Sequence, residues 1–181
     1  MFYVPKAASA LPALIHLGAQ GNLGALVGTA FQVAVQIDLQ IARGMQFSVI
    51  CAEDTPFITE ADIKQSSANS FYGDARTRPT MGACAEWPRA TVPASFLDPI
   101  KSDAPVLIVS GELDPVTPPW LAEPVARNLP HSRHVIIHNG THNSYECVEG
   151  VVADFIDKGT AQGLDTSCVE KIQRPPFTIL K

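Results

Sequence analysis

Residues 105–119 read PVLIVSGELDPVTPP, and residues 134–143 read HVIIHNGTHN. Each stretch opens with a short apolar run bounded by turn-forming residues, which is the pattern of a buried parallel strand. Residues 120–129 between them predict a helix that contains Pro124, and residues 148–156 carry apolar side chains at helical spacing. Two strand–loop–helix units in succession predict an α/β fold with a parallel sheet.

A carboxylate and an imidazole follow the carboxyl ends of these strands, with Asp114 after the first and His142 after the second. Because catalytic groups gather at this edge of a parallel sheet, we expect the two side chains to lie side by side. Asp followed by His is the acid–base half of the Ser–Asp–His triad in its α/β-hydrolase order. Thr117 is expected to hydrogen-bond within the acid loop and keep the carboxylate aimed. Taken singly, Asp114 also suits a turn aspartate and His142 an exposed loop histidine.

The serine that such a triad needs is not recognisable in this sequence. A nucleophile of this fold lies in a G-x-S-x-G turn between a strand and a helix, and no serine has that frame. Ser110 comes nearest because Gly111 follows it, but Ile108 stands where the first glycine should be. A glycine-rich oxyanion loop is absent as well. The chain therefore holds two of the three members of a triad.

A metal site is the competing interpretation, because several ligand-type side chains cluster in sequence: His131, His134, His138, His142 and Cys147. No H-E-x-x-H signature is present among them. We therefore expect no metal, and acyl transfer by a triad needs no organic cofactor.

The chain has four cysteines, Cys51, Cys84, Cys147 and Cys168, which allow three pairings. Chain order favours Cys51–Cys84 and Cys147–Cys168, and disulfides would indicate an oxidising compartment. The alternative is four reduced, buried thiols.

Residues 7–37 carry no charge, yet polar residues and glycines interrupt every window long enough to span a membrane. We predict a pair of short helices instead, with Pro12 near the start of the first, Gly21 past its end and Asn22 capping the second. No secretory signal is expected in this stretch.

The middle of the chain is less regular. Residues 45–50 alternate in polarity and predict a strand. Residues 58–75 are helical in part, beginning with a capping box at Thr59 and Asp62. Residues 77–99 are rich in proline and predict a loop.

The overall composition bounds the class of protein. The 181 residues are 46% hydrophobic and 17% charged, with a net charge of −5 from 13 basic and 18 acidic side chains. This hydrophobic content excludes intrinsic disorder, and the length suffices for one good core. The acidic balance argues against a nucleic-acid partner.

The sequence resembles the C-terminal part of the tripeptidyl-aminopeptidase-like α/β-hydrolases, which are secreted or cell-envelope serine exopeptidases. The similarity covers essentially the whole chain, and the matching segments are 44–54, 84–88, 105–119, 126–134, 140–142, 163–168 and 174–177. The family usually has Gly-x-Gly-His before its catalytic histidine, whereas this chain has Asn139-Gly-Thr-His142, so Thr141 puts a β-branched residue into a tight loop.

The resemblance implies that Asp114 is the triad acid and His142 the triad base. It also implies that residues 1–43 end a helical lid, that residues 44–181 are the C-terminal part of the hydrolase core, and that the nucleophile lies in a missing N-terminal half. The substrate would be a peptide with a free amino terminus, and Glu53 and Asp54 are candidates for binding its ammonium group. These two acids equally suit a solvated turn.

Two rival functions remain open at this point. An esterase-type hydrolase would use the same triad, because a fold does not fix the acyl substrate. A non-catalytic remnant of such a hydrolase would fold or bind without doing chemistry.

Overall fold

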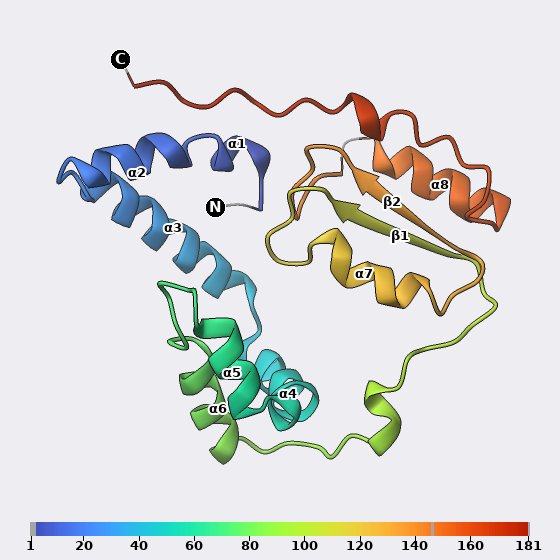
Figure 1. Ribbon diagram of the computed structural model, residues 1–181, viewed down its shortest axis with the longest axis horizontal. Coiled ribbons are helices and arrows are strands. Elements are labelled where there is room, and N and C mark those ends of the chain that lie inside the picture. Colours follow the sequence, from blue (N-terminus) through green and yellow to red (C-terminus); the bar gives the residue numbers. More distant parts are fainter. Residues whose placement is uncertain (1–2, 146, 181) are drawn as a thin grey trace. The chain divides into compact units, whose positions relative to one another are not determined.

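The computed structural model describes residues 3–145 and 147–180, which form two compact units. The first unit joins Met1–Val33 to Pro99–Lys181, and the second is Ala34–Asp98. Elements of the first unit are α1 (Pro5–Ala8), α2 (Leu11–Ala19), β1 (Val106–Gly111), α7 (Pro119–Ala126), β2 (Ser132–Ile137), α8 (Val148–Lys158) and η3 (Val169–Lys171), and α3 (Gly24–Gln40) runs from this unit into the second (Figure 1). The assignment of residues 1–43 to a lid stays a prediction.

The sheet positions the loops of interest. Strands β1 and β2 pair in parallel, with Val106 opposite Ser132 and Gly111 opposite Ile137. Helix α7 connects them, so the segment is a β–α–β unit and both strands end at the same edge. The two strands predicted on either side of α7 and the α/β class are confirmed.

The core of this unit lies on one face of the sheet. Val135 and Ile137 pack there with Val148 of α8 and Val169 of η3, and all four side chains are buried. In Figure 1, α7 and α8 flank the two strands on opposite sides. Helix α8 is the predicted amphipathic helix, and it ends at Gly159 with a φ of 62°, a conformation that suits glycine.

Helix α7 is shorter than predicted. It begins at Pro119, where the missing amide would have no partner in any case, and it ends at Ala126 instead of continuing to residue 129. Pro124 lies inside the helix and cannot donate to the preceding turn.

The predicted pair of helices corresponds to α2 and α3, but α3 is 17 residues long and therefore not a short helix. Pro12 lies in the first turn of α2, and Gly21 follows the end of that helix with a φ of 89°. Helix α3 begins at Gly24, and the carbonyl of Leu23 accepts the amide of Val27. Leu23 therefore takes the N-cap position, and the capping role predicted for Asn22 is wrong.

The second unit is helical where a strand was expected. Residues Arg43–Glu53 form α4, so the strand predicted at 45–50 is wrong. A strand would have turned Met45 and Val49 to one covered face, but both are exposed. The helix instead directs Cys51 inward, where its side chain is fully buried and bonded to Cys84.

Two further helices follow in this unit after η1 (Thr55–Phe57). Helix α5 (Glu60–Ser67) begins with the predicted capping box, in which Asp62 donates its amide to Thr59 Oγ1 at 3.2 Å. Residues Thr77–Glu86 form α6, so the predicted loop is wrong over this part. The proline of this helix lies in the first turn, where no amide partner exists. From residue 87 the chain is a loop broken by η2 (Ala94–Leu97).

Both expected disulfides are present. Cys51–Cys84 joins α4 to α6 within the second unit, and Cys147–Cys168 joins the start of α8 to the segment before η3. Two such bonds are consistent with an extracellular protein.

Among the described residues no single helix is long and apolar enough to cross a membrane. The segments Gly24–Gln40 and Arg43–Phe57 are together long and apolar enough to span a membrane, by length and composition only, but the chain bends by 86° between them.

Candidate active site

The loop after β1 holds Asp114 in a fixed position. The side chain is buried, and its two oxygens accept three hydrogen bonds from the same loop. Oδ1 accepts the amides of Val116 and Thr117 at 2.8 and 3.1 Å, and Oδ2 accepts the Thr117 hydroxyl at 2.7 Å. Thr117 therefore makes hydrogen bonds within the acid loop, and its role in aiming the carboxylate stays a prediction.

The loop after β2 is packed directly against the acid loop. The amide of Leu113 donates to the carbonyl of Gly140 at 2.7 Å. A Cβ on Gly111 would lie 2.5 Å from the carbonyl oxygen of Thr141, which is closer than any side chain tolerates. Glycine is required at residue 111 for the two loops to approach this closely.

The left-handed turn of this second loop falls on Asn139, which has a φ of 54°. Asparagine tolerates that conformation better than most residues. Thr141 is not among the described residues with positive φ, so this position does not require the left-handed backbone that disfavours a β-branched residue. The substitution of Thr for Gly is compatible with the turn.

Asp114 and His142 meet at the sheet edge. Nδ1 of His142 lies 2.9 Å from Oδ2 of Asp114 and 3.2 Å from Oδ1, and Thr117 Oγ1 lies 3.3 Å from the same nitrogen. The imidazole is 30% exposed while the carboxylate side chain is 4% exposed. A carboxylate at Nδ1 selects the tautomer that carries its proton there, which leaves the lone pair on Nε2.

Hydrogen bonding keeps this carboxylate ionised. Burial alone would raise the pKa of Asp114. The Thr117 hydroxyl, the amides of Thr117 and Val116, and His142 together outweigh that effect and lower the pKa to about 2. Asp114 is therefore a stable negative charge behind the imidazole.

Sequence reasoning missed two features around the pair. Glu112 Oε2 lies 2.9 Å from Nδ1 of His138 and accepts the amide of Asn139 at 2.8 Å, which adds a second link between the two loops. Tyr3 contacts His142 from a distant part of the sequence, with ring centroids 5.0 Å apart and planes at 90°. The Glu112 link had a readable signal, because its position after β1 matches that of His138 after β2.

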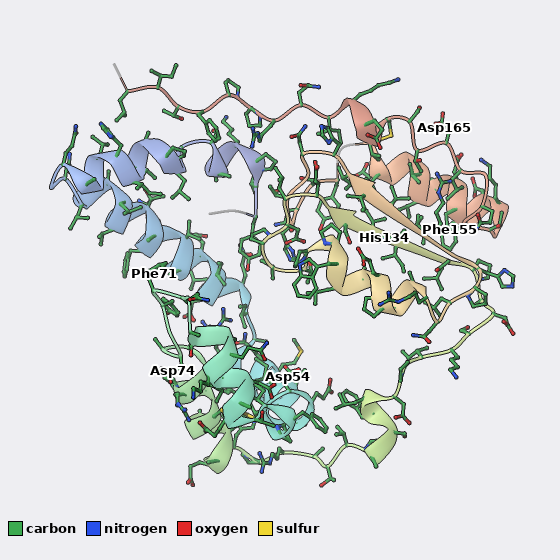
Figure 2. All side chains as sticks on the ribbon, viewed as in Figure 1. Asp54, Phe71, Asp74, His134, Phe155 and Asp165 are labelled. Carbon is green, nitrogen blue, oxygen red and sulfur yellow. A yellow bond between two sulfur atoms is a disulfide. The ribbon has the colours of Figure 1, made fainter. Side chains whose placement is uncertain are left out.

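Ser110 hydrogen-bonds to a different histidine, His134. Its hydroxyl is buried in β1 and lies 2.9 Å from Nε2 of His134, which is labelled in Figure 2. Within residues 3–145 and 147–180, no serine hydroxyl hydrogen-bonds to His142.

Glu53 and Asp54 belong to the second unit. They lie at the carboxyl end of α4 and line a cavity of about 610 Å³ together with Arg43 and Arg76 (Asp54 is labelled in Figure 2). Their suggested role in binding an ammonium group stays a prediction.

Comparison with known proteins agrees with this architecture. Residues 69–168, more than half of the chain, match the α/β-hydrolase family model described as TAP-like protein. No curated protein and no solved structure matches the chain. The matched residues include β1, β2, Asp114 and His142. The chain belongs to the TAP-like family of α/β-hydrolases.

Proposed function

We propose that this chain supplies the acid and the base of a Ser–Asp–His triad in a serine exopeptidase of the tripeptidyl or prolyl aminopeptidase type. Asp114 is the acid, His142 is the base, and the serine comes from a part of the hydrolase that precedes these residues. The observation that carries the proposal is the 2.9 Å contact between a buried carboxylate and Nδ1 of a partly exposed imidazole.

In this mechanism Nε2 of His142 removes the proton of the serine hydroxyl as the oxygen attacks the scissile carbonyl carbon. The imidazolium then gives that proton to the leaving amine, and an acyl-enzyme forms. Water, deprotonated by the same nitrogen, attacks the acyl carbon; the bond to the serine oxygen breaks, the imidazolium returns the proton to that oxygen, and the acid is released. Asp114 stays ionised throughout and stabilises the imidazolium, as its low pKa requires. Oxyanion donors come from the same missing part as the serine.

Exposed apolar side chains support the proposal that the chain completes a larger hydrolase. Val109 of β1 is 37% exposed and Ile136 of β2 is 42% exposed, although parallel strands are normally covered on both faces. Trp120 and Val125 on α7 are 63% and 50% exposed. An N-terminal half of the fold would cover such surface.

The remaining parts of the proposal concern the substrate and its surroundings. Residues 1–43 form the end of a lid, and the exposed Val27 and Phe31 on α3 suit a segment that packs against further helices. Glu53 and Asp54 bind the free amino terminus of the peptide. The protein is secreted or held at the cell envelope, which the two disulfides support.

The test begins with the DNA immediately upstream of codon 1. An in-frame G-x-S-x-G supports the proposal, and the extended protein is then expressed and assayed on aminoacyl and tripeptidyl arylamides. Asp114→Asn is expected to lower kcat by about 10⁴-fold, because the imidazole loses its tautomer and its counter-charge. Asp54→Asn is expected to raise KM for substrates with a free amine and leave their N-acetylated forms unchanged.

Three outcomes contradict the proposal. Hydrolysis of simple esters with no activity on arylamides would assign the triad to an esterase. Absence of any upstream nucleophile motif would identify a non-catalytic remnant. Labelling of the 181-residue chain alone by a fluorophosphonate would place a reactive serine inside it, and Ser110 beside His134 would be the first candidate.

A further inference from the structure

The segment before α1 is attached to the histidine loop by its backbone. The carbonyl oxygen of Tyr3 accepts the hydroxyl of Thr141 at 2.9 Å and the amide of Asn143 at 3.0 Å. These two donors flank His142 in the sequence. The Tyr3 ring then lies across the imidazole, with 5.0 Å between centroids and perpendicular planes, which is a favourable aromatic arrangement.

Thr141 is itself held in place. Its side chain is buried, and its amide donates to Ser144 Oγ at 2.7 Å. Ser144 is also buried, and its Oγ lies 3.4 Å from Oγ1 of Thr141. These contacts position the Thr141 hydroxyl beside His142, where it donates to the segment before α1.

The imidazole of His142 contacts Asp114 through Nδ1 and Tyr3 through its ring. Nδ1 faces the carboxylate of Asp114, which fixes that edge of the ring. The His142 side chain is only partly exposed to solvent, and the Tyr3 ring contacts it. An aromatic ring at this place limits the directions from which water and substrate reach the imidazole.

We propose that Thr141 is a positioning residue that, with the Asn143 amide, locks Tyr3 against His142, and that the Tyr3 ring forms a fixed wall of the active site. The inference rests on the proposed function, because a wall at the imidazole matters to the reaction only if His142 acts as the base. It concerns two residues to which the proposed triad gives no role.

Four variants of the 181-residue chain separate the ring from its attachment. Tyr3→Ala removes the ring, and Tyr3→Phe keeps it. Thr141→Val removes the hydroxyl at nearly constant volume, and Thr141→Ser retains a hydroxyl. Tyr145→Ala is the matched control, because Tyr145 is an exposed tyrosine of the same loop.

Two measurements report on the wall without any need for catalysis. The first is the NMR shift of the His142 ring protons, which the neighbouring tyrosine ring displaces. The second is the rate at which diethyl pyrocarbonate modifies His142, quantified by peptide mass spectrometry against exposed His131 as an internal reference. A change confined to His142 distinguishes positioning from general loosening, which would speed modification of several histidines together.

We expect Tyr3→Ala to abolish the ring-current shift and Tyr3→Phe to preserve it. Thr141→Val is expected to speed modification of His142 about fivefold, which is the population change that follows loss of one hydrogen bond. Thr141→Ser should restore the wild-type rate, and Tyr145→Ala should not alter it.

The inference is overturned if Tyr3→Ala and Thr141→Val both leave the ring-proton shifts and the modification rate of His142 at their wild-type values. It is equally overturned if Thr141→Ser fails to rescue, or if all histidines react faster together. Failure of the proposed function gives a different result: the wall is intact by both measurements, while the extended protein with its upstream serine shows no activity that depends on His142.

Discussion

The low pKa of Asp114 makes acid stability the sharpest quantitative test of the site. The ordinary value for this carboxyl is 3.8, and in the fold it falls to about 2. At about 1.4 kcal/mol per pKa unit, this difference corresponds to about 2 kcal/mol of folding free energy. Because the folded pKa is the lower one, this contribution is complete above about pH 5 and is lost as the pH falls from about 4 to 2.

The perturbation that isolates the cause is Thr117→Val. It removes the hydroxyl that donates to Asp114 Oδ2 at 2.7 Å and keeps the shape of the side chain. A hydrogen bond to a charged group contributes about 1.5–3 kcal/mol, so the pKa of Asp114 should rise by about one to two units. Burial raises the pKa of this carboxyl, and in the variant fewer hydrogen bonds remain to lower it.

The assay is a titration of the Asp114 carboxyl carbon by NMR, run beside urea unfolding between pH 2 and 6. Thr117→Ser is the control, because it retains a hydroxyl at the same position. We expect wild type and Thr117→Ser to titrate together and Thr117→Val to titrate at higher pH with a weaker dependence of stability on acid. An Asp114 that titrates near 3.8 in the wild type, or that ignores the loss of the hydroxyl, refutes the reasoning.

Two further predictions concern what holds the loops and the core. Gly111→Ala places a Cβ 2.5 Å from the Thr141 carbonyl, so it should lower the free energy of unfolding in urea by about 2 kcal/mol or more and displace His142 from Asp114. The control Gly82→Ala, whose Cβ would have no atom within 4 Å, should change neither. The double change Cys147→Ser and Cys168→Ser opens a loop of 21 residues, so it should lower the free energy of unfolding by about 3 kcal/mol and speed amide hydrogen exchange at Val148 and Val169. An unchanged midpoint of urea unfolding would contradict the assigned pairing.

The sequence was most informative where a continuous apolar run is followed by turn residues and a polar side chain suited to catalysis. The apolar runs before Gly111 and before His138 predicted β1 and β2, because a buried parallel strand needs a continuous apolar segment and turn residues at its ends. Parallel pairing brings the carboxyl ends of both strands to one edge of the sheet, which is why the sequence alone predicts that Asp114 and His142 lie side by side. The contacts of Thr117 followed from the same loop.

The errors have an identifiable physical origin. At Met45–Ile50 the alternation of apolar and polar residues is also compatible with a helix, and the disulfide of Cys51 decides between the two by fixing which side faces inward. The density of prolines over residues 77–99 suggested a loop, but Pro79 lies in the first turn of α6, where a proline sacrifices no hydrogen bond. In both segments tertiary context or position within the helix outweighed the local pattern.

Tyr3 could not have been found from the sequence. Nothing in its neighbourhood marks it as a partner of residues more than a hundred positions away, and its hydrogen bonds use the backbone carbonyl, which every residue has. Contacts of this kind depend on the path of the chain alone. They are visible only once α1 and the histidine loop are placed within one unit.

The acid–base pair depends on little outside its own β–α–β unit. Every hydrogen bond that keeps Asp114 ionised comes from the loops after β1 and β2, and the close approach of those loops is fixed by Gly111 and the Gly140 carbonyl. The carboxylate, the tautomer of His142 and the direction of Nε2 are therefore set before a nucleophile is added. Under the proposed function, a serine hydroxyl would need only to reach that nitrogen, because these loops already bury and orient the charge of Asp114. This local self-sufficiency explains how the carboxylate–imidazole pair can be fully organised in a chain with no recognisable nucleophile.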